Sequence, residues 1–145
     1  MAHISTYLTF NGNCREAMTF YRDALGGGDL LFQTIGESPF SGEMPAHMKD
    51  AILHSTLTKG ALTLMASDMV GEQGLMRGNA VSLMLTGESE EQLHTLYNNL
   101  AEGGTATHPL ETTFWGALFG GLTDTFGNHW LLIFDKNSDK NAEKI

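Results

Sequence analysis

Hydrophobic and polar residues alternate as in β-strands in some segments and recur at helical spacing in others, and the same succession of elements occurs twice. Residues 4–10 alternate and are rich in β-formers, which predicts a strand. Asn13 is placed to cap a helix, with Glu16 three residues on to complete a capping box. Gly26–Gly28 ends this helix. Apolar residues recur at helical spacing between these limits and define one face: Ala17, Phe20, Tyr21, Ala24 and Leu25.

The remainder of the first half predicts strands around one irregular loop. Strands are expected at 30–35, 51–58 and 61–66. Lys59-Gly60 is a two-residue turn signal that would join the last two strands in a hairpin. The loop at 36–50 has no period, and its apolar side chains indicate either a flexible lid or a dimer contact. They are Phe40, Met44 and Met48.

The pattern begins again after a polar stretch. Ser89 and Gln92 predict a second capped helix, which Gly103-Gly104 ends. Further strands are expected at 80–85, 105–108, 115–122 and 128–134. With a shift of 76 residues, Asn13 meets Ser89 and the glycine stops coincide, so we infer an internal duplication.

Two strand–helix–strand–strand–strand units predict an α+β fold. Each is a βαβββ module, a curved mixed sheet with a helix on one face and a cleft on the other. We expect modules at 1–66 and 80–134, a connector at 67–79 and a frayed polar tail at 135–145. Ser67 and Asp68 open the connector, where they are expected either to cap it or to reach a ligand.

The two faces of the predicted first-module hairpin differ in polarity. Counting outward from Lys59-Gly60 pairs Leu57 with Leu62 on one face, which is apolar enough to pack against a helix. The other face is half polar, and polar residues on an inner face predict a lined cavity rather than a dry core. That face carries His54, Thr56, Thr63 and Met65.

Residues 115–130 concentrate aromatic and glycine residues in the second half. They predict either a hairpin with an aromatic core or a hairpin that also forms a pocket wall. Trp115 is the preferred pocket-wall residue, and Phe119, Phe126 and Trp130 are expected mainly in the core. Asp124 is expected to hold the following turn through an Asx interaction.

Composition narrows the class of partner. The 145 residues carry a net charge of −9, which disfavours nucleic acid and anionic membrane surfaces. The one cysteine, Cys14, excludes an intramolecular disulfide and is expected to be an inert thiol. The sequence shows no signal peptide and no long apolar run, so a soluble cytoplasmic protein is predicted.

Three stretches together resemble PhnB-like proteins: residues 7–21, 64–68 and 115–130. PhnB-like proteins belong to the vicinal oxygen chelate superfamily, with glyoxalase I, extradiol dioxygenases and bleomycin-resistance proteins. The resemblance covers roughly residues 4–134. It implies paired βαβββ modules and a homodimer, in which subunits frequently exchange modules. Such sequences often carry a ubiquinone-methyltransferase label, but no nucleotide-binding Gly-rich loop follows a strand in this chain.

The resemblance also implies positions for a divalent metal, one near each module end. Carried over, they fall at Ser5 or Thr6, at Met65, at Ala80 or Asn79, and at Leu131. A divalent ion prefers carboxylate or imidazole donors, so no metal and no other cofactor is predicted.

The function expected is binding of a small, partly apolar molecule, by sequestration or in a metal-independent reaction. The alternative is a metal-dependent isomerase or dioxygenase with a displaced site that uses His54 with His108 or His129. A third hypothesis is a structural or regulatory dimer with a vestigial pocket. His54 is the best catalytic candidate, although it is equally expected as a histidine bonded to a neighbouring hydroxyl. The predicted ligand-binding residues are Tyr7, His54, Thr56, Thr63, Met65, Trp115 and Phe119.

Overall fold

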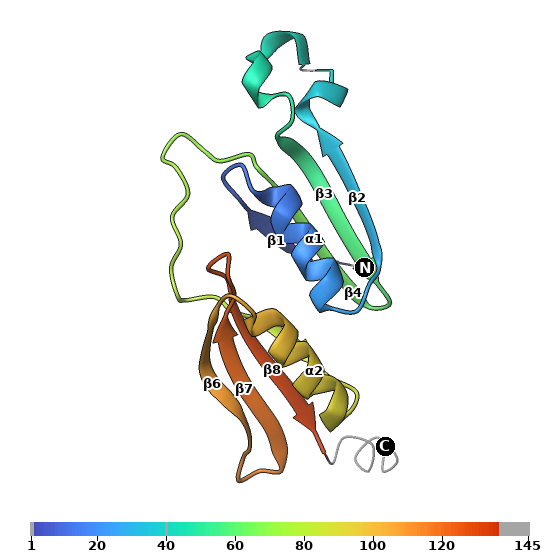
Figure 1. The fold of residues 1–145 in the computed structure, drawn as a ribbon, viewed down its shortest axis with the longest axis vertical. Helices are drawn as coiled ribbons and strands as arrows, with labels where there is room; N and C mark the ends of the chain where they lie inside the picture. The colour runs from blue at the N-terminus through green and yellow to red at the C-terminus, as the bar shows by residue number, and fades with distance from the viewer. Residues whose placement is uncertain (1, 40, 137–145) are drawn as a thin grey trace. The chain divides into compact units, whose positions relative to one another are not determined.

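The computed structural model describes residues 2–39 and 41–136. The chain divides into two compact units, unit 1 at Met1–Met76 and unit 2 at Arg77–Ile145. Each unit has a four-stranded mixed sheet with an α-helix along one face (Figure 1). The predicted α+β fold of two tandem βαβββ modules is confirmed. Phe40 and the predicted tail from residue 137 onward lie outside the described residues.

Unit 1 has strand order β1-β4-β3-β2, and its β1–β4 pair is parallel while the other pairs are antiparallel. Short 3₁₀ turns follow β2 in the predicted irregular loop. The bounds are β1 Thr6–Thr9, α1 Cys14–Ala24, β2 Asp29–Thr34, β3 Ile52–Lys59 and β4 Leu62–Ser67, with 3₁₀ turns at Ile35–Glu37, Ser41–Glu43 and Ala46–Met48.

Unit 2 repeats this topology with strand order β5-β8-β7-β6, and β5 and β8 are again the parallel pair. The bounds are β5 Leu83–Thr86, α2 Glu90–Ala101, β6 Thr105–Thr112, β7 Ala117–Thr123 and β8 His129–Asp135. The strand predicted at 80–85 therefore begins three residues late, and the strand predicted at 105–108 runs on to Thr112. The shared strand order supports the inferred duplication.

The β3–β4 turn differs from the prediction by one residue. Lys59 pairs with Leu62, so the turn is Gly60-Ala61, and Gly60 supplies its left-handed position with φ 58°. The register moves by two residues, which leaves every side chain on its predicted face because strand periodicity is two. Leu57 now pairs with Leu64, and both are buried as expected for the helix-packing face.

The start of α1 corrects another prediction. Asn13 makes no side-chain cap, and a carboxylate from a distant position replaces it. Asp68 Oδ1 accepts hydrogen bonds from Gly12 N at 2.9 Å and Cys14 N at 3.0 Å, and its Oδ2 accepts one from Ile52 N at 2.9 Å. Asp68, which was expected either to cap the connector or to reach a ligand, thus joins the N-terminus of α1 to the start of β3. At α2 the predicted cap is confirmed, because Ser89 Oγ accepts from Gln92 N at 3.0 Å.

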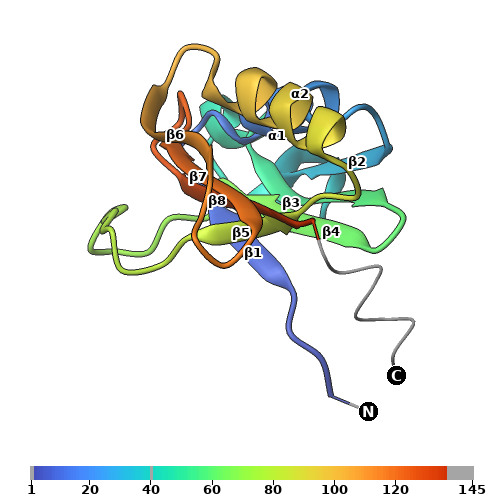
Figure 2. The same ribbon diagram turned by 90° about the horizontal axis from the view of Figure 1, so that it is seen from below.

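Each unit has its own core between helix and sheet. In unit 1, α1 packs on β2, β3 and β4, and in unit 2, α2 packs on β6, β7 and β8 (Figure 2). The largest fully buried side chains include Tyr21, Met18 and Leu57 in unit 1, and Leu93, Leu122 and Leu132 in unit 2. The sheet faces turned away from the helices carry the candidate functional residues.

Candidate functional site

A row of side chains crosses the unit 1 sheet on the face opposite α1, which we call the open face. The backbone register places Tyr7 beside Met65, Met65 beside Thr56, and Thr56 beside Leu31. Tyr7 is 52% exposed and Leu31 is 70% exposed, whereas Met65 and Thr56 between them are half-buried. Exposed apolar side chains therefore flank a more sheltered centre that has a hydroxyl group.

His54 lies on the same face, one register step along β3. Its Nε2 is 3.1 Å from Thr56 Oγ1, and its ring centroid is 6.2 Å from that of Tyr7, with the planes tilted by 31°. The hydroxyl contact that was expected for a structural histidine is therefore present. Thr63, which pairs with Thr58, shares the face. The structure thus brings together five of the predicted residues: Tyr7, His54, Thr56, Thr63 and Met65.

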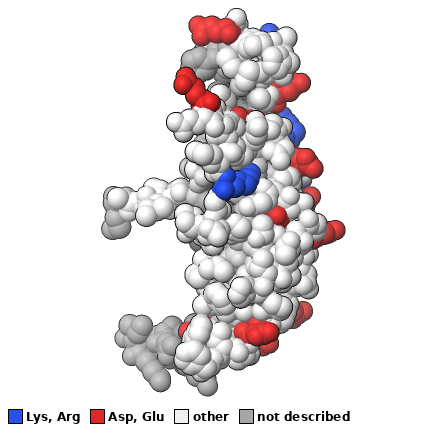
Figure 3. Space-filling view, turned by 90° about the vertical axis from the view of Figure 1, so that its left-hand side faces the viewer, with Lys and Arg blue, Asp and Glu red and all other residues white. Residues whose placement is uncertain are grey.

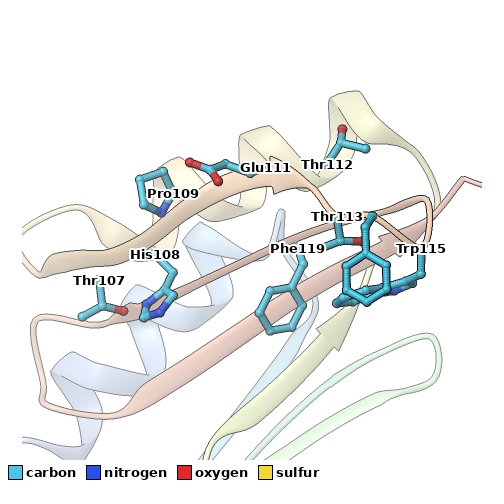
Figure 4. A pocket seen from close by; sticks show the side chains of 9 residues that line it. Thr107, His108, Pro109, Glu111, Thr112, Thr113, Trp115 and Phe119 are labelled. Carbon is cyan, nitrogen blue, oxygen red and sulfur yellow. The ribbon is translucent and has the colours of Figure 1, made fainter.

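The other two predicted residues belong to unit 2, where Trp115 and Phe119 line a hollow of about 350 Å³ beside the β6–β7 hairpin. Its walls also include His108, Glu111 and Thr113. In Figure 4 the rings of His108, Phe119 and Trp115 follow one another along the hairpin. Trp115 lies in the turn before β7 rather than on the predicted strand, and it is 54% exposed.

Two irregularities in β6 shape this hollow. The β6–β7 register shifts between Thr105 and His108 and again between His108 and Glu111. At the shift, the Tyr97 hydroxyl of α2 shares its one proton between the carbonyls of His108, at 2.9 Å, and Gly121, at 2.8 Å. Burial raises the pKa of Tyr97, so the hydroxyl keeps its proton for these bonds. Tyr97 therefore satisfies carbonyls at the point where the strand pairing is irregular.

Residues 115–130 supply both a core aromatic residue and a residue that lines the hollow, which are the two roles that the sequence left open. Trp130 is buried, and its Nε1 donates to Asp124 Oδ2 at 2.8 Å. Asp124 Oδ1 accepts from the backbone N–H groups of Phe126 and Asn128, which confirms the predicted Asx interaction. Trp130 is thus part of the core, whereas Trp115 is available at the surface.

The alternative hypothesis pairs His54 with His108 or His129, and the ring nitrogens of these two histidines differ in their surroundings. His129 has Nδ1 2.9 Å from Thr123 Oγ1 and Nε2 3.1 Å from the carbonyl oxygen of Gly78. Because both ring nitrogens have partners, His129 has none left for a metal ion. His108 is exposed and lines the unit 2 hollow.

The positions that the resemblance implies for a divalent metal do not offer suitable donors: they are Ser5 or Thr6, Met65, Ala80 or Asn79, and Leu131. Met65 lies beside Tyr7, and Leu131 lies beside Met84 in the equivalent place of unit 2. Hydroxyl, thioether, amide and alkyl groups are poor ligands for such ions compared with carboxylate and imidazole. Within residues 2–39 and 41–136, no three His, Cys, Asp or Glu side chains are grouped to hold an ion. The donor set therefore does not fit the superfamily metal.

Sequence reasoning missed residues on both candidate surfaces. Leu31 follows from the alternation of β2 once the β2–β3 register is known, but no local pattern indicates that register. In unit 2, Phe114 is 99% exposed beside Trp115. The β6 extension that contributes Glu111 is defined by its pairing with Phe119 of β7, which has no local sequence signal.

The fold and the comparisons define the class of protein. Solved structures with the same fold include a glyoxalase/bleomycin resistance protein/dioxygenase family enzyme from Burkholderia phytofirmans, 12% identical with a TM-score of 0.59 over 90% of this chain and 97% of that chain. This likeness defines the glyoxalase/bleomycin-resistance fold alone. The chain belongs to the family described as 3-demethylubiquinone-9 3-methyltransferase, whose sequence profile matches residues 2–133.

Relatives confirm the resemblance to PhnB-like proteins. Protein YjdN of Escherichia coli K12 is 31% identical over 89% of this chain and 92% of its own length. The structure of protein PA1353 from Pseudomonas aeruginosa is 41% identical, with a TM-score of 0.79 over 93% of this chain and 98% of that chain. A PhnB protein from Bacillus cereus is 27% identical, with a TM-score of 0.73 over 92% and 99% of the two chains.

Proposed function

We propose that this PhnB-like protein binds a small, partly apolar molecule on the open face of unit 1, and that binding needs no metal. The observation that carries the proposal is the graded polarity of that face. Exposed Tyr7 and Leu31 border half-buried Thr56, His54 and Met65. Ligand sites typically combine apolar walls with a few polar groups that fix orientation.

The polar groups on this face are hydroxyls, one imidazole, the Gln33 amide beside His54 and, at the edge strand, the Asp29 carboxylate beside Thr58. His54 and Thr56 share one hydrogen bond, so the imidazole retains its other nitrogen for a ligand carbonyl or hydroxyl. The protein as a whole is acidic, and the face drawn in Figure 3 shows scattered acidic side chains with few basic ones. A neutral ligand with one polar end suits this surface better than an anion.

The methyl transfer in the family description finds little support at the helix N-termini. A nucleotide-type cofactor is commonly held where a glycine-rich turn exposes backbone N–H groups at a helix start. At α1 the amides of Gly12 and Cys14 already donate to Asp68. We therefore take binding, rather than methyl transfer, as the function that this chain supports best.

We further propose that the protein acts as a homodimer, since large apolar side chains are exposed on the open faces of both sheets. Leu31 is 70% exposed in unit 1 and Met84 is 57% exposed in unit 2. Contact with a second copy would remove such apolar area from water. Sedimentation velocity tests this directly. A dimer is expected, and a monomer at micromolar concentration contradicts it.

Within the described part of the chain, no helix is long and apolar enough to cross a membrane.

A thermal-shift screen of small molecules tests the binding proposal. A hit should stabilise the chelator-treated wild type by RT ln(1 + [L]/Kd), which is about 2.7 kcal/mol at a hundredfold excess over Kd. His54→Ala and Tyr7→Ala should each weaken the shift. His94→Ala, an exposed histidine of α2, is the matched control and should leave it unchanged. A hit that is insensitive to both open-face variants contradicts the proposal, as does a screen in which nothing binds.

A further inference from the structure

The unit 2 hollow beside the β6–β7 hairpin presents an exposed corner of aromatic rings. The Phe114 and Trp115 ring centroids are 5.0 Å apart, with planes at 87° to each other. Phe114 is 99% exposed and Trp115 is 54% exposed, while Phe119 is half-buried beside them. Exposing such large apolar area has no benefit for the folding of unit 2, because removing it from water is favourable.

The turn that carries these rings is held by its own hydrogen bonds. Thr113 N donates to the Ala117 carbonyl at 2.7 Å, Thr113 Oγ1 donates to the same carbonyl at 2.8 Å, and Gly116 N donates to the Thr113 carbonyl at 3.1 Å. Ala117 N in turn donates to Thr113 Oγ1 at 3.2 Å. The Trp115 backbone is therefore fixed before any ligand arrives, which lowers the entropic cost of binding.

The charges around the hollow select against anions. Glu111 is in its wall, directly opposite Phe119 in the β6–β7 register, and none of the Lys and Arg residues in 2–39 and 41–136 lines it. Lys136 contacts the lining, with Nζ 3.0 Å from Thr112 Oγ1. Its charge is already paired with Glu90 at 3.8 Å.

We propose that this hollow is a binding site for a planar aromatic ring that carries no negative charge. The inference rests on the proposed small-molecule function but concerns different residues from those of the open face. Trp115 and Phe119 stack on the ring or meet its edge, and the electron-rich Trp115 face tolerates a cationic substituent. His108 and Thr107 are the polar lining groups available to a substituent. About 350 Å³ is enough for a bicyclic ring system.

Two tryptophans give the protein an internal control for this test. In ¹⁵N-labelled protein the indole N–H of Trp115 reports on the hollow, whereas that of buried Trp130, bonded to Asp124, reports on the fold. The probes are naphthalene rings with a 2-hydroxymethyl, a 2-aminomethyl or a 2-carboxylate group, at pH 7. We expect the first two to shift the Trp115 signal saturably, with Kd of about 1 mM or tighter. The carboxylate should bind at least tenfold more weakly, and Trp130 should not move.

Variants locate the site and identify the resonance. Phe119→Leu should weaken the response of the Trp115 signal about tenfold. The indole N–H signal that disappears in Trp115→Leu is the Trp115 signal. This variant should also abolish saturation transfer to the probes. An unmoved Trp130 signal verifies that the variant is folded. Phe20→Leu, a half-buried aromatic of α1, is the matched control and should bind like wild type.

An unmoved Trp115 signal with all three probes overturns the inference, as does equal binding of the carboxylate or full binding by Phe119→Leu. The open-face proposal is tested separately by its His54-dependent thermal shift. If that shift persists while Trp115 stays unmoved, only the aromatic site is wrong. If Trp115 responds while no His54-dependent ligand is found, the open-face proposal fails.

Discussion

Replacing Asp68 tests how unit 1 is held together. Asp68→Ala removes a carboxylate that accepts three backbone hydrogen bonds, from Gly12, Cys14 and Ile52, at 2.9, 3.0 and 2.9 Å. These bonds join the start of α1 to the start of β3. Asn13→Ala is the matched control, because Asn13 occupies the N-cap position without a side-chain cap bond.

The magnitude follows from the number and type of these bonds. A hydrogen bond contributes about 1 kcal/mol net and somewhat more when the acceptor is charged, so the three together contribute about 3 kcal/mol. Part of this is offset where water can reach the freed amides, because Gly12 is exposed. Asn13→Ala should change the free energy of unfolding by less than about 0.5 kcal/mol.

Urea unfolding followed by far-ultraviolet circular dichroism measures the difference. With an m-value of about 2 kcal/mol per molar, Asp68→Ala should lower the midpoint of the unit 1 transition by about 1.5 M. Labelling of Cys14 by a thiol reagent then reports on unit 1 alone, since Cys14 is the chain's only cysteine and is buried there. Equal midpoints for Asp68→Ala and Asn13→Ala would refute the account of Asp68 as the cap of α1.

Three further predictions concern single buried groups. Tyr97→Phe should destabilise unit 2 by about 2 kcal/mol in urea followed by the fluorescence of Trp115 and Trp130, because the buried Gly121 carbonyl and the part-buried His108 carbonyl lose their shared donor. Burial raises the pKa of Tyr97 in the folded state, so the stability that its protonated hydroxyl contributes is fully present below the ordinary tyrosine pKa. That contribution is lost as pH rises through the folded-state pKa. Wild type should therefore lose stability at high pH more steeply than Tyr97→Phe. Cys14 should resist iodoacetamide at pH 8 until the protein unfolds, because burial, with the Asp68 charge, raises its pKa to about 12, and fast native labelling contradicts this. Ser55→Ala should raise stability by about 1 kcal/mol, since the buried Ser55 hydroxyl has no hydrogen-bond partner among the residues that the structure describes. Ser67→Ala, by contrast, removes the acceptor for Met69 N and should lower stability.

The sequence allowed good predictions wherever a pattern is local or periodic. The face carrying His54 and Thr56 was predicted correctly even though the turn was misplaced at Lys59-Gly60, because a shift of two residues preserves strand faces. The Ser89 cap and the Asp124 turn are likewise short-range interactions that their residue types favour.

Long-range contacts were beyond the sequence. Asn13 has the residue type of a helix cap, but a carboxylate 54 residues from Cys14 in the chain outcompetes it. The Tyr97 hydroxyl likewise contacts carbonyls 11 and 24 residues away, which no local pattern indicates. Alternation also placed the start of the strand wrongly at Trp115, which lies in the turn before β7, because the alternation of side chains does not define where a strand begins.

The most direct test of the central claim is calorimetric titration of the first screening hit into protein stripped of metal by chelation and into the same protein reloaded with Zn, Ni, Mn or Fe(II). The account predicts the same affinity in every preparation, because Met65 and Leu131 stand at positions where a metal would need carboxylate or imidazole donors. The same titration with His54→Ala should show weaker binding in all of them. Binding that appears only in reloaded protein, and disappears with His54→Ala, would contradict the claim that this chain binds its ligand without a metal.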